Sequence, residues 1–149
     1  MEFLFYNMRH RKTIRLRKYD YTKEGWYFVT IEPNDRKYSF CKILNGNIIL
    51  NKIGKIIDER WRWLFSRYDH IMMDEYIIMP VHFGYNHQNK LDLSHIIGAF
   101  KTTASKRIHE ARYPNFKWKR SFHDRIIRQD ELEIKRAYIR NNPKNWKKK

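Results

Sequence analysis

The sequence predicts a single α+β domain that spans all 149 residues. Short apolar segments with strand-like composition alternate with three longer segments that are interpreted as helices. In the first two of these, apolar residues recur every three or four positions. No repeat, linker or low-complexity stretch divides the chain, and only residues 147–149 read as a loose tail. A chain of this length buries roughly two thirds of its unfolded surface without disulfides or metals. The expected order is strand, hairpin, helix, strand, helix, strand and helix.

The first strand and the hairpin have the clearest local signals. β-branched and aromatic residues predict a strand from Trp26 to Ile31, after a turn at Gly25. The pair Asn45-Gly46 separates apolar runs at 40–44 and 48–50. Because a type I′ turn needs positive φ at both central residues, this pair predicts a tight hairpin.

Helical and strand periods then alternate along the rest of the chain. Apolar spacing predicts a helix over 51–65 and a strand over 71–79, which ends where Pro80 lacks a backbone donor. A second helix is expected over 93–108, with its apolar residues on one face. A last strand within 118–128 and a helix from Asp130 complete the pattern.

The charge of the chain points to a polyanionic partner. Its 32 Lys and Arg residues outnumber 16 Asp and Glu residues, which gives a formal net charge of +16. The N-terminal segment 1–18 is a basic arm, either a solvated tail or a contact for phosphate backbone. The cations expected to contact DNA are Arg9, Arg11, Lys12, Arg15, Arg17, Lys18, Lys101, Lys106, Lys119 and Arg120.

A membrane partner is not expected, because no apolar run approaches the roughly 20 residues that span a bilayer. Residues 1–6 are too short and wrongly flanked for a signal peptide. The expected location is therefore cytoplasmic, in association with the nucleoid. The single cysteine, Cys41, cannot form an internal disulfide and is interpreted as a small buried hydrophobe.

Aromatic residues lie beside cations at 61–63 and 118–120, where half of them could stack on unpaired bases and half are expected in the core. Other familiar chemistries lack their motifs. The sequence has no phosphate-binding glycine loop, no Cys-x-x-Cys pair and no paired carboxylates in convincing register.

A candidate site is suggested by Tyr138 and Asn142. They lie four residues apart in a predicted helix stopped by Pro143, so both side chains leave one helix face. A phenol and an amide oxygen there could share one metal-bound phosphate. Upstream in the chain, His82 would add an imidazole at the end of the strand predicted over 71–79. Each residue also has an ordinary structural interpretation: a buried helix tyrosine, a helix C-terminal residue and a hydrogen-bonded strand-end histidine.

The order of several motifs resembles the HUH-type single-tyrosine transposases of small insertion sequences, and most closely the REP-associated tyrosine transposases. The matching segments, which span nearly the whole chain, are 13–16, 19–21, 25–31, 72–80, 97–101, 118–124, 126–128 and Tyr138-Ile-Arg-Asn-Asn-Pro143. The resemblance implies a ferredoxin-like antiparallel sheet with helices packed on it. It also implies a DNA partner, single-stranded or hairpin, and either a monomer or a homodimer.

The resemblance implies a role for each site residue. Tyr138 would be the nucleophile that becomes joined to the 5′ phosphate of a cut strand. His82 and Asn142 would be ligands of Mg²⁺ or Mn²⁺, and His123 and Asp124 would support them as neighbours. Metal-assisted cleavage and rejoining of DNA is the expected activity.

One departure from the family pattern limits this expectation. The family usually reads Met-Pro-Asn-His-hydrophobic-His, whereas here Val81-His82-Phe83-Gly84 follows Met79-Pro80, so Gly84 stands where the second histidine is expected. The alternative is therefore a DNA-binding descendant with impaired catalysis. A basic RNA-binding or ribosome-associated protein is a third class.

Overall fold

The computed structural model describes residues 26–68, 72–88 and 93–146, and the basic arm 1–18 and the tail 147–149 lie outside the described residues. The described elements are β1 (Trp26–Ile31), β2 (Cys41–Leu44), β3 (Asn47–Leu50), α1 (Lys52–Arg67), β4 (Met72–Met79), β5 (His82–Gln88), α2 (Leu93–Glu110), β6 (His123–Ile127), a 3₁₀ turn η1 (Gln129–Glu131) and α3 (Leu132–Asn141). All predicted elements are present, together with one strand, β5, that was not predicted.

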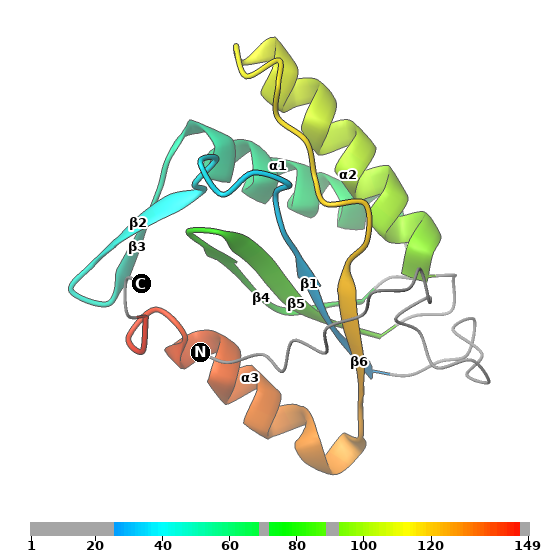
Figure 1. Ribbon diagram of the computed structural model, residues 1–149. Helices are drawn as coiled ribbons and strands as arrows, with labels where there is room; N and C mark the ends of the chain where they lie inside the picture. The colour runs from blue at the N-terminus through cyan, green and yellow to red at the C-terminus, as the bar shows by residue number, and fades with distance from the viewer. Residues whose placement is uncertain (1–25, 69–71, 89–92, 147–149) are drawn as a thin grey trace, which may run out of the picture.

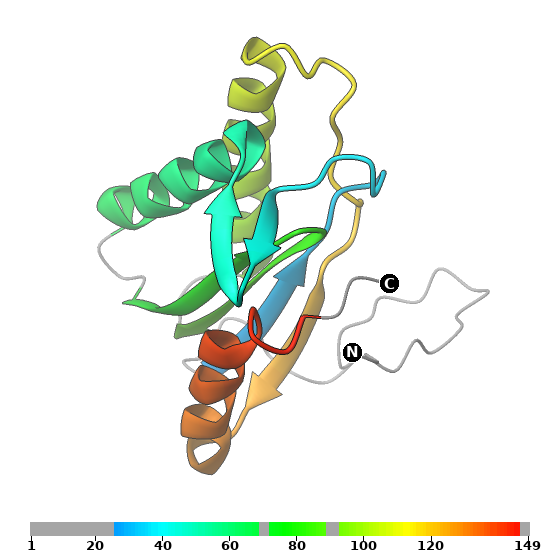
Figure 2. The same ribbon diagram turned by 90° about the vertical axis from the view of Figure 1, so that its left-hand side faces the viewer.

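Four strands form an antiparallel sheet in the order β4-β5-β1-β6. With α1 and α2 as the connections, this is the β-α-β-β-α-β arrangement of ferredoxin-like folds. Figure 1 shows α1 and α2 on one side of the sheet and α3 on the other. In the turned view of Figure 2, the separate β2–β3 hairpin lies between α1 and α3. The predicted α+β class is confirmed.

The hairpin and the start of α1 follow from local chemistry. Asn45 and Gly46 both have positive φ, at 51° and 75°, as the predicted type I′ turn requires. Asn51 caps α1, because its side chain accepts a hydrogen bond from the backbone N–H of Gly54 at 3.0 Å. A Cβ at Gly54 would lie 2.1 Å from the carbonyl oxygen of Phe40, so only glycine permits this close approach.

The prediction that His82 ends the strand over 71–79 is wrong. The chain turns at Pro80 and Val81, and His82 pairs with Met79 as the first residue of β5. The usual two-residue hairpin has a residue with positive φ, and neither turn residue has one. The sequence therefore carries no local signal for this turn, and the strand that follows it was not predicted.

The last two elements begin later than predicted. The final strand is confined to β6, and the helix expected from Asp130 starts at Leu132, after η1. The backbone N–H of Arg128 donates to the side chain of Glu131 at 3.2 Å, so a capping interaction begins two residues before the predicted helix start at Asp130.

The sheet separates two apolar clusters. The larger one lies under α1 and α2. Its fully buried large side chains are Tyr27, Ile31, Phe40, Ile57, Trp61, Leu64, Leu93, Phe100 and Phe116. The smaller one lies under α3 and comprises Phe28, Ile77, Met79, Ile127, Leu132 and Ile139. The predicted burial of Cys41 is confirmed at 2% exposure, and burial raises the pKa of its thiol to about 11.

Candidate functional site on the α3 face of the sheet

Tyr138 lies on α3 and packs onto the sheet, with its ring half-buried. Its ring meets that of Phe28 edge to face, with ring centroids 6.1 Å apart. Burial raises the pKa of the Tyr138 phenol, and the hydrogen bond with the Asn142 side chain acts in the opposite direction. The phenol is thus protonated at neutral pH and needs nearby positive charge to react as a nucleophile.

Asn142 is the C-terminal cap residue of α3, one turn beyond Tyr138. Only 6% of it is exposed, although it is polar. Its backbone N–H donates to the Ile139 carbonyl at 3.3 Å. Its side chain forms a hydrogen bond with Tyr138. The phenol and the amide therefore lie together on one face of the helix, as the four-residue spacing predicted.

His82 begins β5 at the same end of the sheet as the C-terminal segment after α3. Its ring lies 6.3 Å from that of Trp146, centroid to centroid. Burial lowers the pKa of His82 to about 4, while the Glu32 carboxylate acts in the opposite direction. The imidazole is therefore neutral at pH 7, which is the form that binds a metal.

Gly84 lies two residues beyond His82 on β5, where alternate residues share one face of the sheet. It is paired with Ile77 on β4 and with Thr30 on β1. A Cβ built at Gly84 would meet the tip of the Phe28 ring at 3.6 Å, which is an ordinary contact. The backbone thus has room for a Cβ at Gly84, beside the ring that Tyr138 contacts.

The donors on this face fit a hydrated divalent cation better than a closed site. Within the described part of the chain, no three side chains of His, Cys, Asp or Glu gather closely enough to hold a metal. A neutral imidazole at His82 and an amide oxygen at Asn142 remain as two donors on one side of the sheet. Magnesium keeps several waters when bound, so two protein donors with water and phosphate oxygens are chemically compatible with it.

His123 and Asp124 are adjacent residues of β6, and their side chains lie on opposite faces of the sheet. His123 is paired with Thr30, and Thr30 is paired with Gly84, so the exposed His123 shares the α3 face. Asp124 is the next residue along β6 and points to the other face. The two residues therefore do not surround the same group.

Two cations on the Tyr138 side of the sheet, Lys135 and Arg125, were not among the predicted site residues. The Lys135 ammonium is 5.3 Å from the centroid of the Tyr138 ring and 5.0 Å from that of Phe28. Arg125 on β6 is paired with Phe28 and faces α3. The i, i+3 spacing of Lys135 and Tyr138 on one helix was a signal available in the sequence.

Ion pairs anchor α3 to the edge strand β4. The Arg136 guanidinium donates to both carboxylate oxygens of Asp74, at 2.9 and 3.1 Å, and also to Glu133. Arg140 pairs with Glu75 at 3.2 Å. These contacts fix the helix that carries Tyr138 against the sheet.

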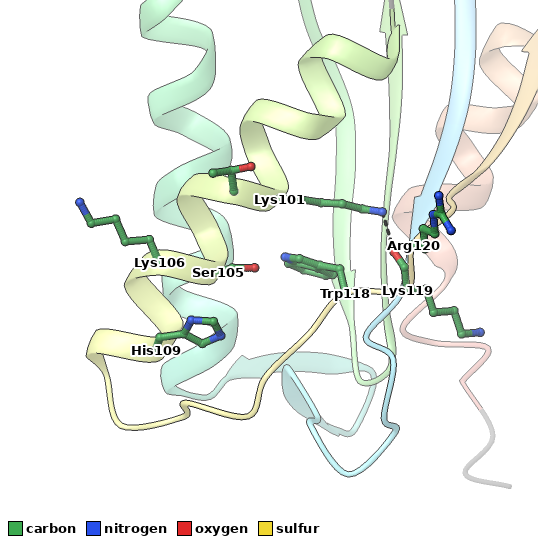
Figure 3. A pocket seen from close by; sticks show the side chains of 8 residues that line it. Lys101, Ser105, Lys106, His109, Trp118, Lys119 and Arg120 are labelled. Atoms are coloured by element: carbon green, nitrogen blue, oxygen red, sulfur yellow. Dashed lines mark hydrogen bonds between the residues drawn. The ribbon is translucent and has the colours of Figure 1, made fainter.

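The predicted DNA contacts on α2 and before β6 line a shallow depression, and Figure 3 shows Lys101 reaching across it toward Lys119. The Lys101 ammonium donates to the carbonyl oxygens of Lys119 and Ser121, at 2.8 and 3.2 Å. Burial lowers its pKa to about 8, although the carbonyl acceptors favour the charged form. Lys119 is paired with Glu32. Both lysines thus hold the segment before β6 in place.

Lys106 and Arg120 are the more exposed cations of this depression. The aromatic residues near cations are mostly structural: Trp61 is fully buried, and Trp118 packs against the larger core. The predicted contacts in the basic arm, at Arg9, Arg11, Lys12, Arg15, Arg17 and Lys18, lie outside the described residues. No helix of the described residues is both long and apolar enough to cross a membrane.

Comparison with known proteins gives one related sequence and two informative structures. No protein-family model matches the chain. An uncharacterised protein of Haemophilus influenzae is 27% identical over 164 residues, which cover 93% of this chain and 91% of that protein. This relative carries no functional description.

Two of the similar structures are named as transposases. A REP-associated tyrosine transposase bound to a REP hairpin has a TM-score of 0.66 at 18% identity, over 87% of this chain and 72% of that one. A "putative transposase" from Deinococcus radiodurans has a TM-score of 0.54 at 12% identity, over 85% and 95% of the two chains. At these identities the likeness establishes a shared fold.

Proposed function

We propose that this protein is a transposase-like DNA-binding protein that cuts and rejoins single-stranded or hairpin DNA through Tyr138. The observation that carries the proposal is the pairing of Tyr138 with the buried Asn142 on α3, over the sheet face that also holds His82. The fold shared with a REP-associated tyrosine transposase and the net charge of +16 support it.

The proposed reaction is a transesterification at one phosphodiester. The Tyr138 phenol loses its proton to solvent and its oxygen bonds to phosphorus, while the bond from phosphorus to the 3′ oxygen breaks. The leaving 3′ oxygen takes a proton from solvent, and the 5′ phosphate stays on the tyrosine. Attack by a 3′ hydroxyl on the phosphotyrosine reverses these bond changes and rejoins DNA.

His82 and Asn142 are the residues proposed to hold Mg²⁺ or Mn²⁺, which would polarise the non-bridging phosphate oxygens when bound. The neutral imidazole and the amide oxygen supply donors without adding negative charge near the phosphate. The Asn142 side chain also acts to lower the pKa of the Tyr138 phenol, which favours the reactive form of the proposed nucleophile.

A DNA-binding protein with impaired catalysis is the second candidate, and Gly84 is the observation that favours it. Gly84 follows His82 at the spacing where the resembled family has a second histidine. With one imidazole fewer, affinity for the metal would be lower and cleavage slower, while the basic surface would still bind DNA.

The test is covalent attachment of labelled hairpin DNA in the presence of Mn²⁺, read on a denaturing gel. Wild type is expected to form an adduct, and Tyr138→Phe is expected to bind the same DNA without forming one. DNA binding without an adduct in wild type would favour the impaired protein. An adduct that persists in Tyr138→Phe would refute the assignment of the nucleophile.

A competition assay separates DNA binding from RNA binding. DNA and RNA of one sequence compete for the protein, and the DNA is expected to bind at least as tightly. Strong preference for RNA would support the third class and overturn the proposal.

A further inference from the structure

Lys135 lies beside Tyr138, and Arg125 on the neighbouring strand is the second cation near Lys135. Lys135 extends from α3 over the rings of Phe28 and Tyr138, with its ammonium 5.0 and 5.3 Å from their centroids. Arg125 extends from the neighbouring strand, and its strand partner is that same Phe28. Phe28 thus contacts both Lys135 and the proposed nucleophile, and it is the strand partner of Arg125.

The two cations have only partial charge compensation. Arg125 donates to the Glu131 carboxylate at 2.9 Å, and Glu131 also lies near Lys135. Burial and repulsion from Arg125 both lower the pKa of Lys135, and Glu131 offsets part of that effect. One carboxylate between two cations leaves a net positive charge at this point.

The other cations of α3 differ in this respect. Arg136 is held by Asp74 and Glu133, and Arg140 by Glu75 and Glu133. Their charges are used to anchor the helix to β4. Lys135 instead rests on aromatic faces, which attract a cation but leave its charge available to a third group.

We propose that Lys135 and Arg125 bind a backbone phosphate of the DNA strand next to the phosphate that Tyr138 attacks. This inference rests on the proposed function, since it names the part of the DNA that these residues hold. An ammonium and a guanidinium from different elements would grip one phosphate from two directions, and a guanidinium can donate two parallel hydrogen bonds to it. Phe28 sets the spacing, because it contacts Lys135 and pairs with Arg125.

Such a contact would align the strand more than it would select a sequence, because phosphates are common to all sequences. Binding there would also place compensating negative charge beside Lys135. The result would be a strand held over the α3 face, with the scissile phosphate at the Tyr138 hydroxyl.

The test uses the full chain and a fluorescein-labelled oligothymidine of about 16 nucleotides, the upper site size for common single-strand binders. Fluorescence anisotropy gives the affinity over a series of salt concentrations. The variants are Lys135→Gln, Arg125→Gln and the double variant, with Lys55→Gln on α1 as an exposed control on the other side of the sheet. Circular dichroism checks that each variant is folded.

Each lost phosphate contact should reduce the slope of log affinity against log salt by about 0.7, since about that fraction of a counterion is released per contact on single strands. Because the phosphate is held only when both residues grip it, each single variant should lose this one phosphate contact. The double variant should then lose about as much of the slope as either single variant. Lys55→Gln should keep the wild-type slope, and Lys135→Arg should restore it.

The outcomes separate this inference from the proposed function. Wild type that binds neither the oligonucleotide nor the hairpin DNA of the covalent-attachment assay would overturn both. Wild type that binds, with unchanged slopes in Lys135→Gln and Arg125→Gln, would overturn the phosphate site alone. An equal loss in Lys55→Gln would also overturn it, because the effect would then be general charge. If Lys135→Gln does not fold, the exposed Arg125→Gln decides the question.

Discussion

The two faces of the central sheet differ in composition and in what they can do. The face under α1 and α2 is covered by a large cluster of aromatic and aliphatic side chains, such as Trp61 and Phe100. The face under α3 has a smaller apolar cluster, bordered by Tyr138, Asn142 and Lys135. One face resembles the interior of an ordinary domain, and the other combines burial with ionisable groups.

This difference indicates a division between stability and chemistry. Burying ionisable or polar groups costs free energy unless each finds a partner, so the groups gathered on the α3 face indicate a reason other than stability. The α1 and α2 side can supply most of the stability through apolar burial. The α3 side can then retain a neutral histidine and a half-buried lysine.

The largest effect on stability is expected from Phe100→Ala. Phe100 is fully buried and its ring contacts those of Trp61 and Trp118, at centroid distances of 5.3 and 5.8 Å. The cavity should lower the free energy of unfolding by about 3–5 kcal/mol, measured by urea titration. Leu44→Ala, at a site 56% exposed, is the control and should change it by no more than about 0.5 kcal/mol. A small loss in Phe100→Ala would mean that this face is not the main source of stability.

Acid should destabilise the protein through His82. Its pKa is near 4 when folded and near 6.5 when unfolded, so between these values the unfolded chain binds the extra proton. Stability therefore falls as pH drops from about 6.5 toward 4, by at most roughly 3.5 kcal/mol at about 1.4 kcal/mol per pKa unit. Thermal melts from pH 7 to pH 4.5 should show a shallower decline in His82→Gln. Identical slopes in the two proteins would show that His82 is not buried as described.

Removing the anchor of α3 should have an intermediate effect. Arg136→Gln loses two hydrogen bonds to the Asp74 carboxylate and should cost about 1–3 kcal/mol. The control is Arg62→Gln, in which a more exposed arginine loses a single hydrogen bond to Asp58 and about 0–1 kcal/mol is expected. Urea titration compares the two. Equal costs would contradict the view that α3 depends on this ion pair.

Gly84→His should affect stability least and metal binding most. The Cβ makes ordinary contacts, so Gly84→Ala should be stable, and the imidazole of the histidine variant would lie on the same face as His82. We expect Mn²⁺ to bind Gly84→His about tenfold more tightly than Gly84→Ala, or about 1.4 kcal/mol, by calorimetric titration. Cleavage of hairpin DNA should rise with it. Equal affinity in the two variants would mean that the added imidazole does not reach the metal.

Most of the fold was predictable because its signals are local. Helical spacing identified α1 and α2, the start at Asp130 and the stop at Pro143 indicated α3, and Asn45-Gly46 identified the hairpin. Each signal depends on residues close in the chain. The strand β5 was missed because Pro80 and Val81 make a turn without a residue of positive φ. The four-residue spacing of Tyr138 and Asn142 predicted their shared helix face correctly for the same local reason.

The sequence by itself determined the α+β class, the strongly basic charge and the pairing of a phenol with an amide on one helix. Only the tertiary structure decided that Lys135 lies over Phe28, that Arg125 faces the same helix, and that Lys101 is bound to backbone carbonyls. These contacts join residues far apart in the chain, and they depend on strand order and register. Periodicity along one segment records which face a residue occupies, but only the packing of segments against each other determines which residues meet there.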